Sequence, residues 1–350
     1  MKVINEAYYQ LKNRIGRIPL LTDFYEHKNI DPEIIANKLG TYYNYLVKKN
    51  EIDIMLPEAS VDILKFVTRE IASGQRLHEL ILINYFMDSP DGILNIEEIR
   101  TIFEKHQLPT DKPILQNVLN TLSTEFYVGG YKKTYQNGAI IEVIDNKIAA
   151  TENFKGALRD TFFVTLLIDL VKLGALNNQV FDNEAPFTAH NRYRRRDTLR
   201  MLAWEQQMVD QNIGGYARDD ANKNFVIFIT LNKGDDFQGA LMAYEDKLVD
   251  QVTMHWFTKS KRTMQSPEVQ ILYNEAEEWN FYVFAKKSND DDTTDYYYLG
   301  EVKPVHDTIK QTQKETSEEK HENVVHMDLK FKKPIDHRLF KYLTSYEDFV

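Results

Sequence analysis

The sequence predicts an α+β protein with a helical domain over residues 1–178 and a curved β-sheet or small-barrel domain over residues 179–350. In the first half, apolar residues recur at spacings of three and four, which is typical of helices. In the second half, short β-rich stretches alternate with Gly, Asp and Asn turns. A length of 350 residues is sufficient for two separate hydrophobic cores.

Helices are expected over most of the first half, with Pro19, Pro32 and Pro57 at entries or breaks. The expected helical ranges are 3–14, 31–48, 60–73 and 77–87. A further amphipathic helix, Phe154–Leu173, is expected to end at Gly174. The composition changes after this glycine, and we place the domain boundary there.

A part of the helical half has the element order of a winged helix, with three helical segments followed by a hairpin. The segments are Leu77–Phe86, Ile96–His106 and Pro113–Phe126, and the hairpin strands are Ile140–Ile144 and Lys147–Ala150. The third segment lacks the Arg, Lys and Ser pattern of a helix that contacts bases in a DNA groove. We therefore interpret this part as a packing module, with groove binding as the alternative.

Seven short strands are expected in the second half. They are Phe225–Leu231, Leu241–Tyr244, Thr253–Phe257, Val269–Leu272, Phe281–Ala285, Tyr296–Leu299 and Val324–Phe331. Two polar stretches, Lys286–Asp295 and Lys310–Asn323, are expected to be solvated loops. The second is expected to lack structure without a partner.

Composition excludes several classes of protein. The absence of cysteine excludes disulfides and thiolate metal sites. A net charge of −10 argues against a protein that coats nucleic acid nonspecifically, although a local basic groove remains compatible with it. There is no run of about 18 apolar residues and no signal peptide at the start, so a cytoplasmic location without a membrane partner is expected.

The usual catalytic motifs are missing. The sequence has no G-x-x-x-x-G-K-[ST], G-x-S-x-G, H-E-x-x-H or G-x-G-x-x-G segment, so we expect no catalytic residues, metal or cofactor in this chain. One nuclease-like fragment provides an alternative. Glu301 and Lys303 follow a predicted strand, with Asp295 and Asp292 upstream, and such a set could hold Mg²⁺ and polarise a water.

Basic and aromatic residues concentrate between residues 190 and 262. Arg192, Arg194 and Arg195 belong to the densest basic run, and arginine forks suit phosphate oxygens. A solvated helix start with paired charges is the alternative for this run. The glycine pair before Tyr216 permits a close ligand approach, with Tyr216 as a stacking face, or it forms a strained turn.

Tyr244, Asp246 and Trp256 have the chemistry of a pocket for an extruded cytosine. Such a pocket needs aromatic rings on both faces of the base and a carboxylate that accepts a hydrogen bond from the N4 amino group. From chemistry alone, the same residues could equally be core aromatics with an aspartate that caps a turn.

The order of several motifs resembles a known family. The motifs are R-Y-x-R, I-G-G-Y, F-x-T/I-x-x-K, Y-E-D, H-W-x-x-S and Y-Y-L-G, found at Asn191–Tyr193 with Arg194, Ile213–Tyr216, Phe228–Lys233, Tyr244–Asp246, His255–Ser260 and Tyr297–Gly300. They resemble the uncharacterised domain that ends many bacterial fusions of phospholipase-D-type nucleases and helicases. The whole chain, including Arg17–Phe24, is similar to the C-terminal half of SauUSI-type, ATP-dependent type IV restriction enzymes.

This resemblance implies a helical coupling region followed by a recognition domain related to SET-and-RING-associated (SRA) readers of modified DNA. It implies that the nuclease and the helicase-like ATPase of the parent enzyme, which use Mg²⁺ and ATP, lie outside this chain. The chain itself would then not be an enzyme. Its role in phage defence would be to recognise DNA for those partner domains.

The resemblance also implies pocket residues. SRA readers carry a G-G-Y-E-D segment and a second tyrosine on the next strand. Here the corresponding run is Met242–Asp246, without the glycine pair, and Trp256 or Phe257 stands where the second tyrosine would be. Lys247 occupies the spacing of the expected acid, so Asp246 or Glu245 would have to serve instead.

The sequence therefore leads to the hypothesis that the second domain extrudes 5-methylcytosine or 5-hydroxymethylcytosine from double-stranded DNA. The pocket residues would be Tyr244, Asp246, Trp256, Tyr216, Glu245 and Phe257. The residues on the DNA backbone would be Arg192, Arg194, Arg195, Lys259, Ser260 and Arg262. A metal-dependent nuclease and a protein-interaction scaffold are the alternatives, and a homodimer would sharpen the discrimination.

Overall fold

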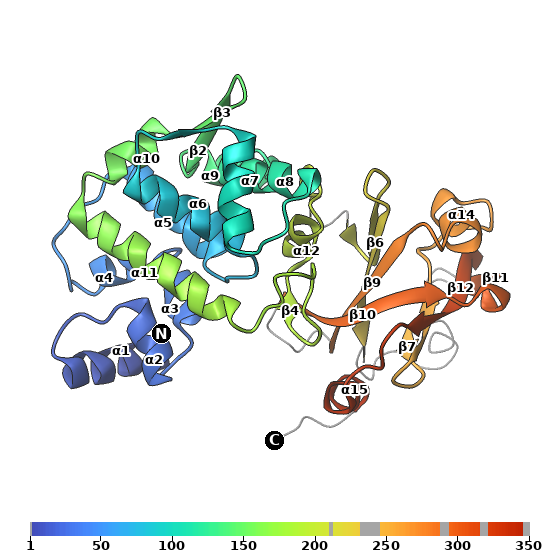
Figure 1. Ribbon diagram of the computed structural model, residues 1–350. Coiled ribbons are helices and arrows are strands. Elements are labelled where there is room, and N and C mark those ends of the chain that lie inside the picture. The colour runs from blue at the N-terminus through green and yellow to red at the C-terminus, as the bar shows by residue number, and fades with distance from the viewer. Residues whose placement is uncertain (1, 210–212, 232–245, 288–293, 316–320, 346–350) are drawn as a thin grey trace. The chain divides into compact units, whose positions relative to one another are not determined.

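The structure is a computed structural model that describes residues 2–209, 213–231, 246–287, 294–315 and 321–345. It divides into two compact units, shown in Figure 1. The helical unit comprises Met1–Pro186 and Arg200–Gln207, and the sheet unit comprises Phe187–Leu199 and Met208–Val350. Compared with the predicted division at residue 178, the first unit extends to Pro186 and regains a short later segment.

The helical unit is built from helices and one small sheet. Its elements are α1 (Lys2–Ile15), α2 (Leu21–His27), α3 (Pro32–Lys38), α4 (Tyr42–Lys48), α5 (Glu58–Phe66), the π-helix η1 (Val67–Ile71), α6 (Leu77–Asp88), β1 (Ile93–Leu94), α7 (Ile96–Lys105), α8 (Lys112–Leu122), α9 (Gly129–Tyr135), β2 (Ile141–Ile144), β3 (Lys147–Ala150), α10 (Glu152–Ala157) and α11 (Thr161–Asn178). Helix α12 (Arg195–Met201) begins in the sheet unit and ends in the helical unit.

Three helix predictions differ from the structure. The predicted single helix Phe154–Leu173 is two helices, α10 and α11, because Asp160 caps the start of α11. The range 31–48 forms two helices, because Thr41 adopts an extended backbone and its side chain accepts a hydrogen bond from the Asn44 N–H as the N-cap of α4. The predicted end at Gly174 is wrong, because α11 continues to Asn178. A Cβ on this glycine would lie 2.9 Å from Leu80, so the glycine permits close helix packing and does not end the helix.

Helix α11 is the central helix of the helical unit. Its buried Asp169 accepts hydrogen bonds from the backbone N–H groups of Leu21 (2.6 Å) and Thr22 (3.1 Å) and so caps the start of α2. Counter to the sequence expectation, α11 is long and apolar enough to cross a membrane by length and composition alone. Core helices of folded domains also meet this criterion, and the buried, hydrogen-bonded Asp169 fits such a core role.

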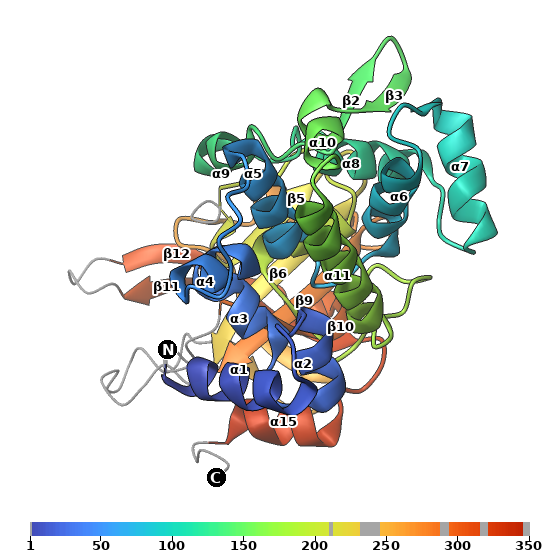
Figure 2. The same ribbon diagram turned by 90° about the vertical axis from the view of Figure 1, so that its left-hand side faces the viewer.

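The predicted winged-helix order is confirmed. Helices α6, α7 and α8 are followed by the β2–β3 hairpin, with the short helix α9 between α8 and β2, and the small sheet has the order β1-β3-β2. Figure 2 shows the β2–β3 hairpin projecting from the helices. On α8, Asn117 donates to the carbonyl of Trp204 (2.6 Å) and Asn120 to that of Glu205 (3.1 Å). The chain of the same unit therefore covers this side of α8, as expected of a packing module.

The sheet unit contains a nine-stranded mixed sheet. Its strands are β4 (Arg192–Tyr193), β5 (Tyr216–Asp219), β6 (Asn224–Leu231), β7 (Lys247–Leu248), β8 (Thr253–Phe257), β9 (Asn280–Lys287), β10 (Tyr296–Pro304), β11 (Lys310–Glu315) and β12 (His321–Phe331). The order is β5-β6-β9-β10-β12-β8-β7, with β4 paired to β10 and β11 to β12. Among the described residues the sheet does not close, so the open curved sheet, and not the barrel, is correct.

The two faces of this sheet differ. One face carries the main hydrophobic core, to which α14 (Pro267–Asn274) and α15 (His337–Thr344) contribute apolar residues. On the other face, over β6, β9 and β10, aromatic rings contact one another. These rings are Phe187, Tyr282, Phe284, Phe228, Tyr296 and Tyr298.

One strand prediction and one loop prediction in this unit are wrong. The predicted strand Val269–Leu272 is part of α14, which begins with Pro267 at a position where proline favours a helix start. The predicted unstructured stretch Lys310–Asn323 contains β11 and the start of β12, which pair over six residues from Lys310↔His326 to Glu315↔His321. The predicted strand Leu241–Tyr244 and most of the loop Lys286–Asp295 lie outside the described residues.

Candidate nucleic-acid interface

Strand β8 directs its side chains alternately to the two faces of the sheet. Met254 and Trp256 are buried, whereas Thr253, His255 and Phe257 are only partly buried. Successive residues of a strand project from opposite faces, so Trp256 and Phe257 cannot line the same pocket. The sequence left open which of the two replaces the second tyrosine of SRA readers, and strand parity separates them.

Trp256 and Tyr216 lie in the core. Trp256 is 1% exposed, and its ring contacts the rings of Tyr216 (5.5 Å between centroids) and Phe225 (6.4 Å). The Tyr216 hydroxyl donates a hydrogen bond to Glu268 (2.8 Å), and burial, reinforced by this contact, raises the pKa of Tyr216. A base could stack on either ring only by displacing these partners. Trp256 thus has the core role that was its alternative interpretation, and Tyr216 is likewise a core ring.

Phe257 lies on the opposite face of β8 from Trp256, and Asp246, directly before β7, is bonded to its backbone. The Asp246 Oδ1 atom accepts a hydrogen bond from the backbone N–H of Phe257 at 2.9 Å. This contact holds the carboxylate at the backbone of Phe257, whose ring is partly buried. The remaining predicted pocket residues, Tyr244 and Glu245, directly precede Asp246 and lie outside the described residues.

Three further polar side chains share the face of Phe257. His326 of β12 is directly opposite Phe257, and Asp328 is directly opposite His255. The rings of Phe257 and His326 are 5.5 Å apart, and the Nδ1 atom of His255 is 2.7 Å from Asp328. Burial, together with His255 and Lys310, lowers the pKa of His326, which favours its neutral form. Phe257 thus stands in a polar, partly buried surrounding.

Three cationic residues form what we call the cationic rim, namely Arg195, Lys259 and Arg262. The Lys259 ammonium lies 4.4 Å from the centroid of the Tyr216 ring and donates to the Tyr216 carbonyl (3.0 Å). Arg262 forms an ion pair with Glu268. Burial lowers the pKa of Lys259, and the nearby charges of Arg262 and Arg195 lower it further. Mutual repulsion of this kind makes a site receptive to an anion such as phosphate.

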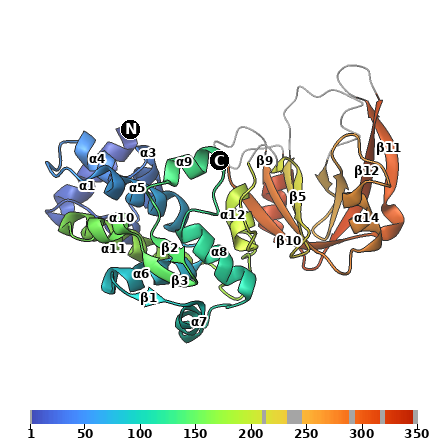
Figure 3. The ribbon, with the colours of Figure 1, turned by 90° about the horizontal axis from the view of Figure 1, so that it is seen from above.

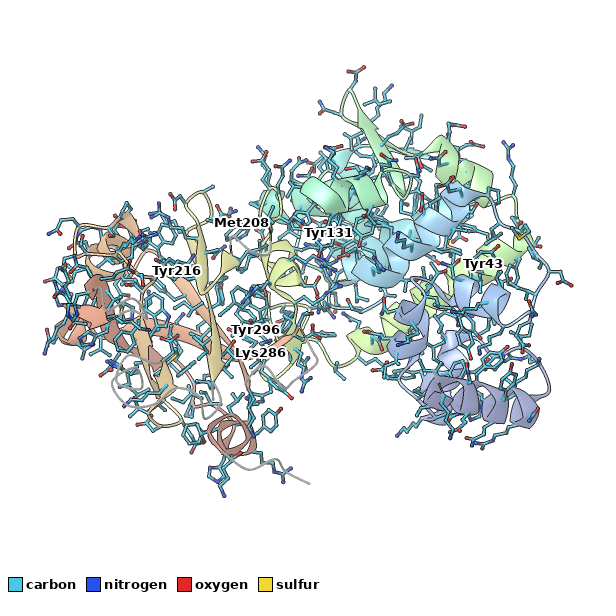
Figure 4. The ribbon with its side chains drawn as sticks, turned by 180° about the vertical axis from the view of Figure 1, so that it is seen from behind. Tyr43, Tyr131, Met208, Tyr216, Lys286 and Tyr296 are labelled. Carbon is cyan, nitrogen blue, oxygen red and sulfur yellow. The ribbon has the colours of Figure 1, made fainter. Side chains whose placement is uncertain are left out.

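Arg195 is also held by aromatic rings. Its guanidinium lies over Tyr296 (5.2 Å) and Phe228 (5.8 Å) and donates to the Tyr296 hydroxyl at 2.7 Å. Lys286 lies over the same Tyr296 ring at 5.4 Å, and Figure 4 shows these two side chains next to each other. Stacking orients each cation without neutralising it, because a ring carries no net charge.

The other residues that the sequence predicted to contact the DNA backbone lie outside the cationic rim or are already paired. Arg192 stacks on Tyr297, with its guanidinium 4.4 Å from the ring centroid. Arg194 forms a two-point ion pair with the buried Asp197 (2.6 and 2.9 Å), so its charge is balanced within the unit, as the alternative interpretation of this run expects. Ser260 is exposed between Lys259 and Arg262. The structure therefore groups Arg195, Lys259 and Arg262 and separates the remainder.

Glu301 and Lys303, the residues of the nuclease alternative, have structural contacts. Glu301 pairs with Lys332, and Lys303 donates to the carbonyls of Ala276 and Trp279 beyond the end of α14. In the part of the chain that the structure describes, no group of three or more His, Asp or Glu could hold a metal ion. The geometry thus gives the nuclease alternative no support.

Sequence reasoning missed several residues of this region, including His255, His326, Asp328 and Glu268. The parity of β8 was a usable signal for His255, because it is two residues from Phe257 on a strand whose bounds were predicted correctly. The pairing of β8 with β12 and the hydrogen bond between Tyr216 and Glu268 join segments far apart in the sequence. No local pattern marks those contacts.

Comparisons with known proteins place the chain among domains without an assigned function. No curated protein matches the sequence. Three solved structures resemble it weakly. The DNA recognition domain of the cytosine modification-dependent restriction endonuclease LpnPI shares 10% identity with a TM-score of 0.29, over 45% of this chain and 80% of that chain. KRYPTONITE in complex with mCHG DNA and SAH shares 13% identity with a TM-score of 0.25, over 43% and 33%.

The third structure contains the sulfur binding domain and SRA domain of ScoMcrA complexed with phosphorothioated DNA. It shares 10% identity with a TM-score of 0.28, over 79% of this chain and 96% of that chain. TM-scores this low do not establish a shared fold.

Two family models together span most of the sequence. Residues 187–343, which form most of the sheet unit, match a domain of unknown function, DUF3427. Residues 4–183, more than half of the chain, match another, DUF8090. The chain belongs to this second family, the domain of unknown function DUF8090.

Proposed function

We propose that the sheet unit recognises a modified cytosine, 5-methylcytosine or 5-hydroxymethylcytosine, in double-stranded DNA by extruding the base from the duplex. The base would stack on Phe257, and the Asp246 carboxylate would accept a hydrogen bond from its N4 amino group. Tyr244 would form the second aromatic wall. The observation that carries the proposal is the 2.9 Å hydrogen bond that fixes the Asp246 carboxylate on the backbone N–H of Phe257, the residue with the partly buried ring.

The cationic rim supports the same function. Lys259 and Arg262 follow Phe257 by two and five residues, so phosphates bound to these cations would lie near β8, the strand that carries Phe257. Phosphate contacts position a duplex, and the pocket then selects the base. The net charge of −10 restricts DNA binding to such a local site, because the rest of the surface repels the polyanion.

In such a pocket, the free-energy cost of extruding the base is close to the gain from stacking it on aromatic rings. Extruding a base costs a few kcal/mol, and stacking on aromatic rings returns about 1–3 kcal/mol per base. A buried methyl group adds about 1 kcal/mol, so one pocket should favour modified over plain cytosine by about tenfold. A homodimer or gating by partner domains would increase this ratio.

Binding of fluorescent duplexes that differ only at one cytosine tests the proposal. We expect the methylated duplex to bind about tenfold more tightly than the plain one. Phe257→Ala should remove this preference and weaken binding at least tenfold, since one stacked face is lost. Tyr273→Ala, which removes an exposed aromatic ring on α14, is the matched control and should bind like the unmodified protein.

Asp246→Asn tests whether the Asp246 carboxylate binds the amino group of the base. The amide oxygen can still accept the Phe257 N–H, so the fold should persist, whereas the negative charge that favours the cytosine amino group is lost. Equal affinity of the wild-type protein for both duplexes would contradict the proposal, as would a Phe257→Ala variant that retains the preference. A base analogue beside the target whose fluorescence rises on unstacking would report extrusion directly.

We also propose that the chain serves as the recognition part of an ATP-dependent type IV restriction enzyme that acts in phage defence in the cytoplasm. The nuclease and the helicase-like ATPase would be its partner domains, and the helical unit would couple to them. This proposal is supported by the motifs between Asn191 and Gly300 and by the Arg17–Phe24 segment. Since the chain would not itself be an enzyme, it should bind methylated DNA without cutting it when Mg²⁺ is added.

A further inference from the structure

Strands β11 and β12 form a two-stranded ribbon at the margin of the sheet unit. In the part of the chain that the structure describes, β11 pairs with β12 alone, over six residues from Lys310↔His326 to Glu315↔His321. Figures 2 and 3 show the ribbon extending beyond the other strands of the sheet. Among the described residues, the outer edge of β11 has no strand partner.

The pairing sorts the polar side chains of the ribbon onto two faces. Gln313 is directly opposite Asn323, and Gln311 lies two residues before Gln313, so these three amides share one face. Lys310 and Thr312 lie on the other face, which continues into that of His326 and Phe257. Gln311 and Gln313 are exposed and Asn323 is partly buried. One face thus presents a row of groups that each offer a hydrogen-bond donor and an acceptor.

The ribbon is attached to the segment that carries the cationic rim. The backbone N–H of Arg262 donates to the carbonyl of Asn323 at 3.1 Å, and Lys261 pairs with Glu322 at 3.5 Å. The Gln311 Oε1 atom accepts from the N–H of Met264 at 3.1 Å. A duplex whose phosphates contact Lys259 and Arg262 would therefore lie within reach of the amide face.

We infer that the β11–β12 ribbon lies in the major groove and recognises bases that flank the modified cytosine, through Gln313 and Asn323. The major groove, about 12 Å wide, accommodates a two-stranded β-ribbon, and Asn and Gln side chains pair with the N6 and N7 atoms of adenine. This inference rests on the proposed function for its location on DNA. It adds sequence selectivity to a site that otherwise distinguishes only the modification.

A purely protective role is the other explanation for a polar ribbon. Lysine and polar residues on an edge strand prevent pairing with a second molecule. Such a role requires polarity and does not require amides at particular positions. Replacing the amides by alanine, with the lysines retained, therefore separates the two explanations.

The experiment uses the full chain and two duplex libraries with randomised bases on both sides of one central cytosine. The central base is 5-methylcytosine in one library and plain cytosine in the other, and the duplexes that bind are selected and sequenced. We expect the wild-type protein to enrich adenine at one or two fixed flanking positions by about tenfold. Gln313→Ala and Asn323→Ala should lose this enrichment and keep the preference for methylcytosine. Asn280→Ala, an exposed amide at the start of β9, is the matched control and should retain both properties.

The outcomes separate the inference from the proposed function. A wild-type protein without a flanking preference, or ribbon variants that keep it, would overturn the ribbon inference while the methylcytosine preference remains intact. Conversely, the flanking preference could depend on Gln313 while the protein binds the methylated and plain libraries equally well. This result would support base recognition by the ribbon and contradict the methylcytosine pocket. Circular dichroism of each variant verifies that the sheet is intact.

Discussion

The helical unit and the sheet unit use charged side chains in opposite ways. In the helical unit, Glu79 is fully buried, and Arg76 and Arg200, 7% and 2% exposed, surround it. Asn117 accepts a further hydrogen bond from Arg76 at 2.8 Å. Burial alone would raise the pKa of Glu79, but the two arginines lower it to about 2, so the carboxylate stays ionised.

In the sheet unit, two cations of the cationic rim, Lys259 and Arg195, instead rest on aromatic rings and remain partly exposed. Lys259 lies over Tyr216 and Arg195 over Tyr296, and both contacts orient the side chain without providing a counter-charge. The comparison teaches that the density of basic residues in a sequence does not identify a binding surface. A cation is most available to phosphate where no buried carboxylate neutralises it, as Asp197 neutralises Arg194; within the cationic rim Arg262 already pairs with Glu268, so Lys259 and Arg195 are the better placed.

The largest effect is expected from Glu79→Gln, which breaks the closed ionic network. The substitution removes the charged carboxylate between the buried Arg76 and Arg200, so the free energy of unfolding of the helical unit should fall by about 3–5 kcal/mol. Urea titration followed by circular dichroism measures this. Glu97→Gln, which removes an exposed partner of Arg100, should change stability by less than about 0.5 kcal/mol. Equal effects of the two variants would refute the contrast between the units.

A loss of similar size is expected from Trp256→Ala in the sheet unit. Removing this buried ring leaves a cavity beside Tyr216 and Phe225 and should lower stability by about 3–5 kcal/mol. Phe257→Ala, one residue further on the opposite face, should cost much less stability and affect DNA binding instead. Thermal melts of the two variants, side by side with binding, provide the measurement. If Phe257→Ala proved the more destabilising change, our placement of the two faces would be wrong.

A smaller loss of stability, which depends on pH, is expected from the buried His78. Its ring packs against Phe103, and burial, with the nearby charge of Arg76, lowers its pKa from 6.5 to about 4. The unfolded chain therefore binds a proton that the folded chain excludes, and stability is lost as the pH falls from about 6.5 toward 4. Between pH 7 and pH 5 the loss should reach about 2 kcal/mol.

His78→Gln should remove this pH dependence, although it lowers stability at neutral pH. Urea midpoints at pH 7 and pH 5 measure the difference, and His106→Gln, at an exposed position, should behave like the unmodified protein. A variant with the same pH dependence as the wild type would show that another group is responsible.

The smallest effect is expected from Lys259→Gln in the cationic rim. Loss of one phosphate contact should reduce the dependence of log Kd on log salt concentration by about 1, equally for methylated and plain duplexes. Arg218→Gln, which removes a cation already paired with Asp220 at 3.2 Å, should leave that slope unchanged. A change restricted to methylated DNA would place Lys259 in the pocket and not on the backbone.

Local patterns predicted those elements that short-range physics determines. The helices near 3–14 and 77–87, the winged-helix order and the strand Thr253–Phe257 all follow from apolar periodicity and turn residues. The same reasoning failed at Val269–Leu272, where a short apolar run suits a strand and a helix equally and Pro267 decides for the helix. It also failed at β11, whose polar residues are ordered by pairing with β12 and not by burial.

The sequence by itself determined that this is a two-part α+β protein with aromatic and basic residues gathered between residues 190 and 262. Only the tertiary structure decided their roles. Consecutive residues Trp256 and Phe257 have similar chemistry, and the face that each presents depends on which side of the sheet the core covers. Likewise, Arg194 and Arg195 differ only in their neighbours, Asp197 for one and Tyr296 for the other. Charge and aromaticity are local properties, whereas burial and pairing depend on segments far apart in the chain.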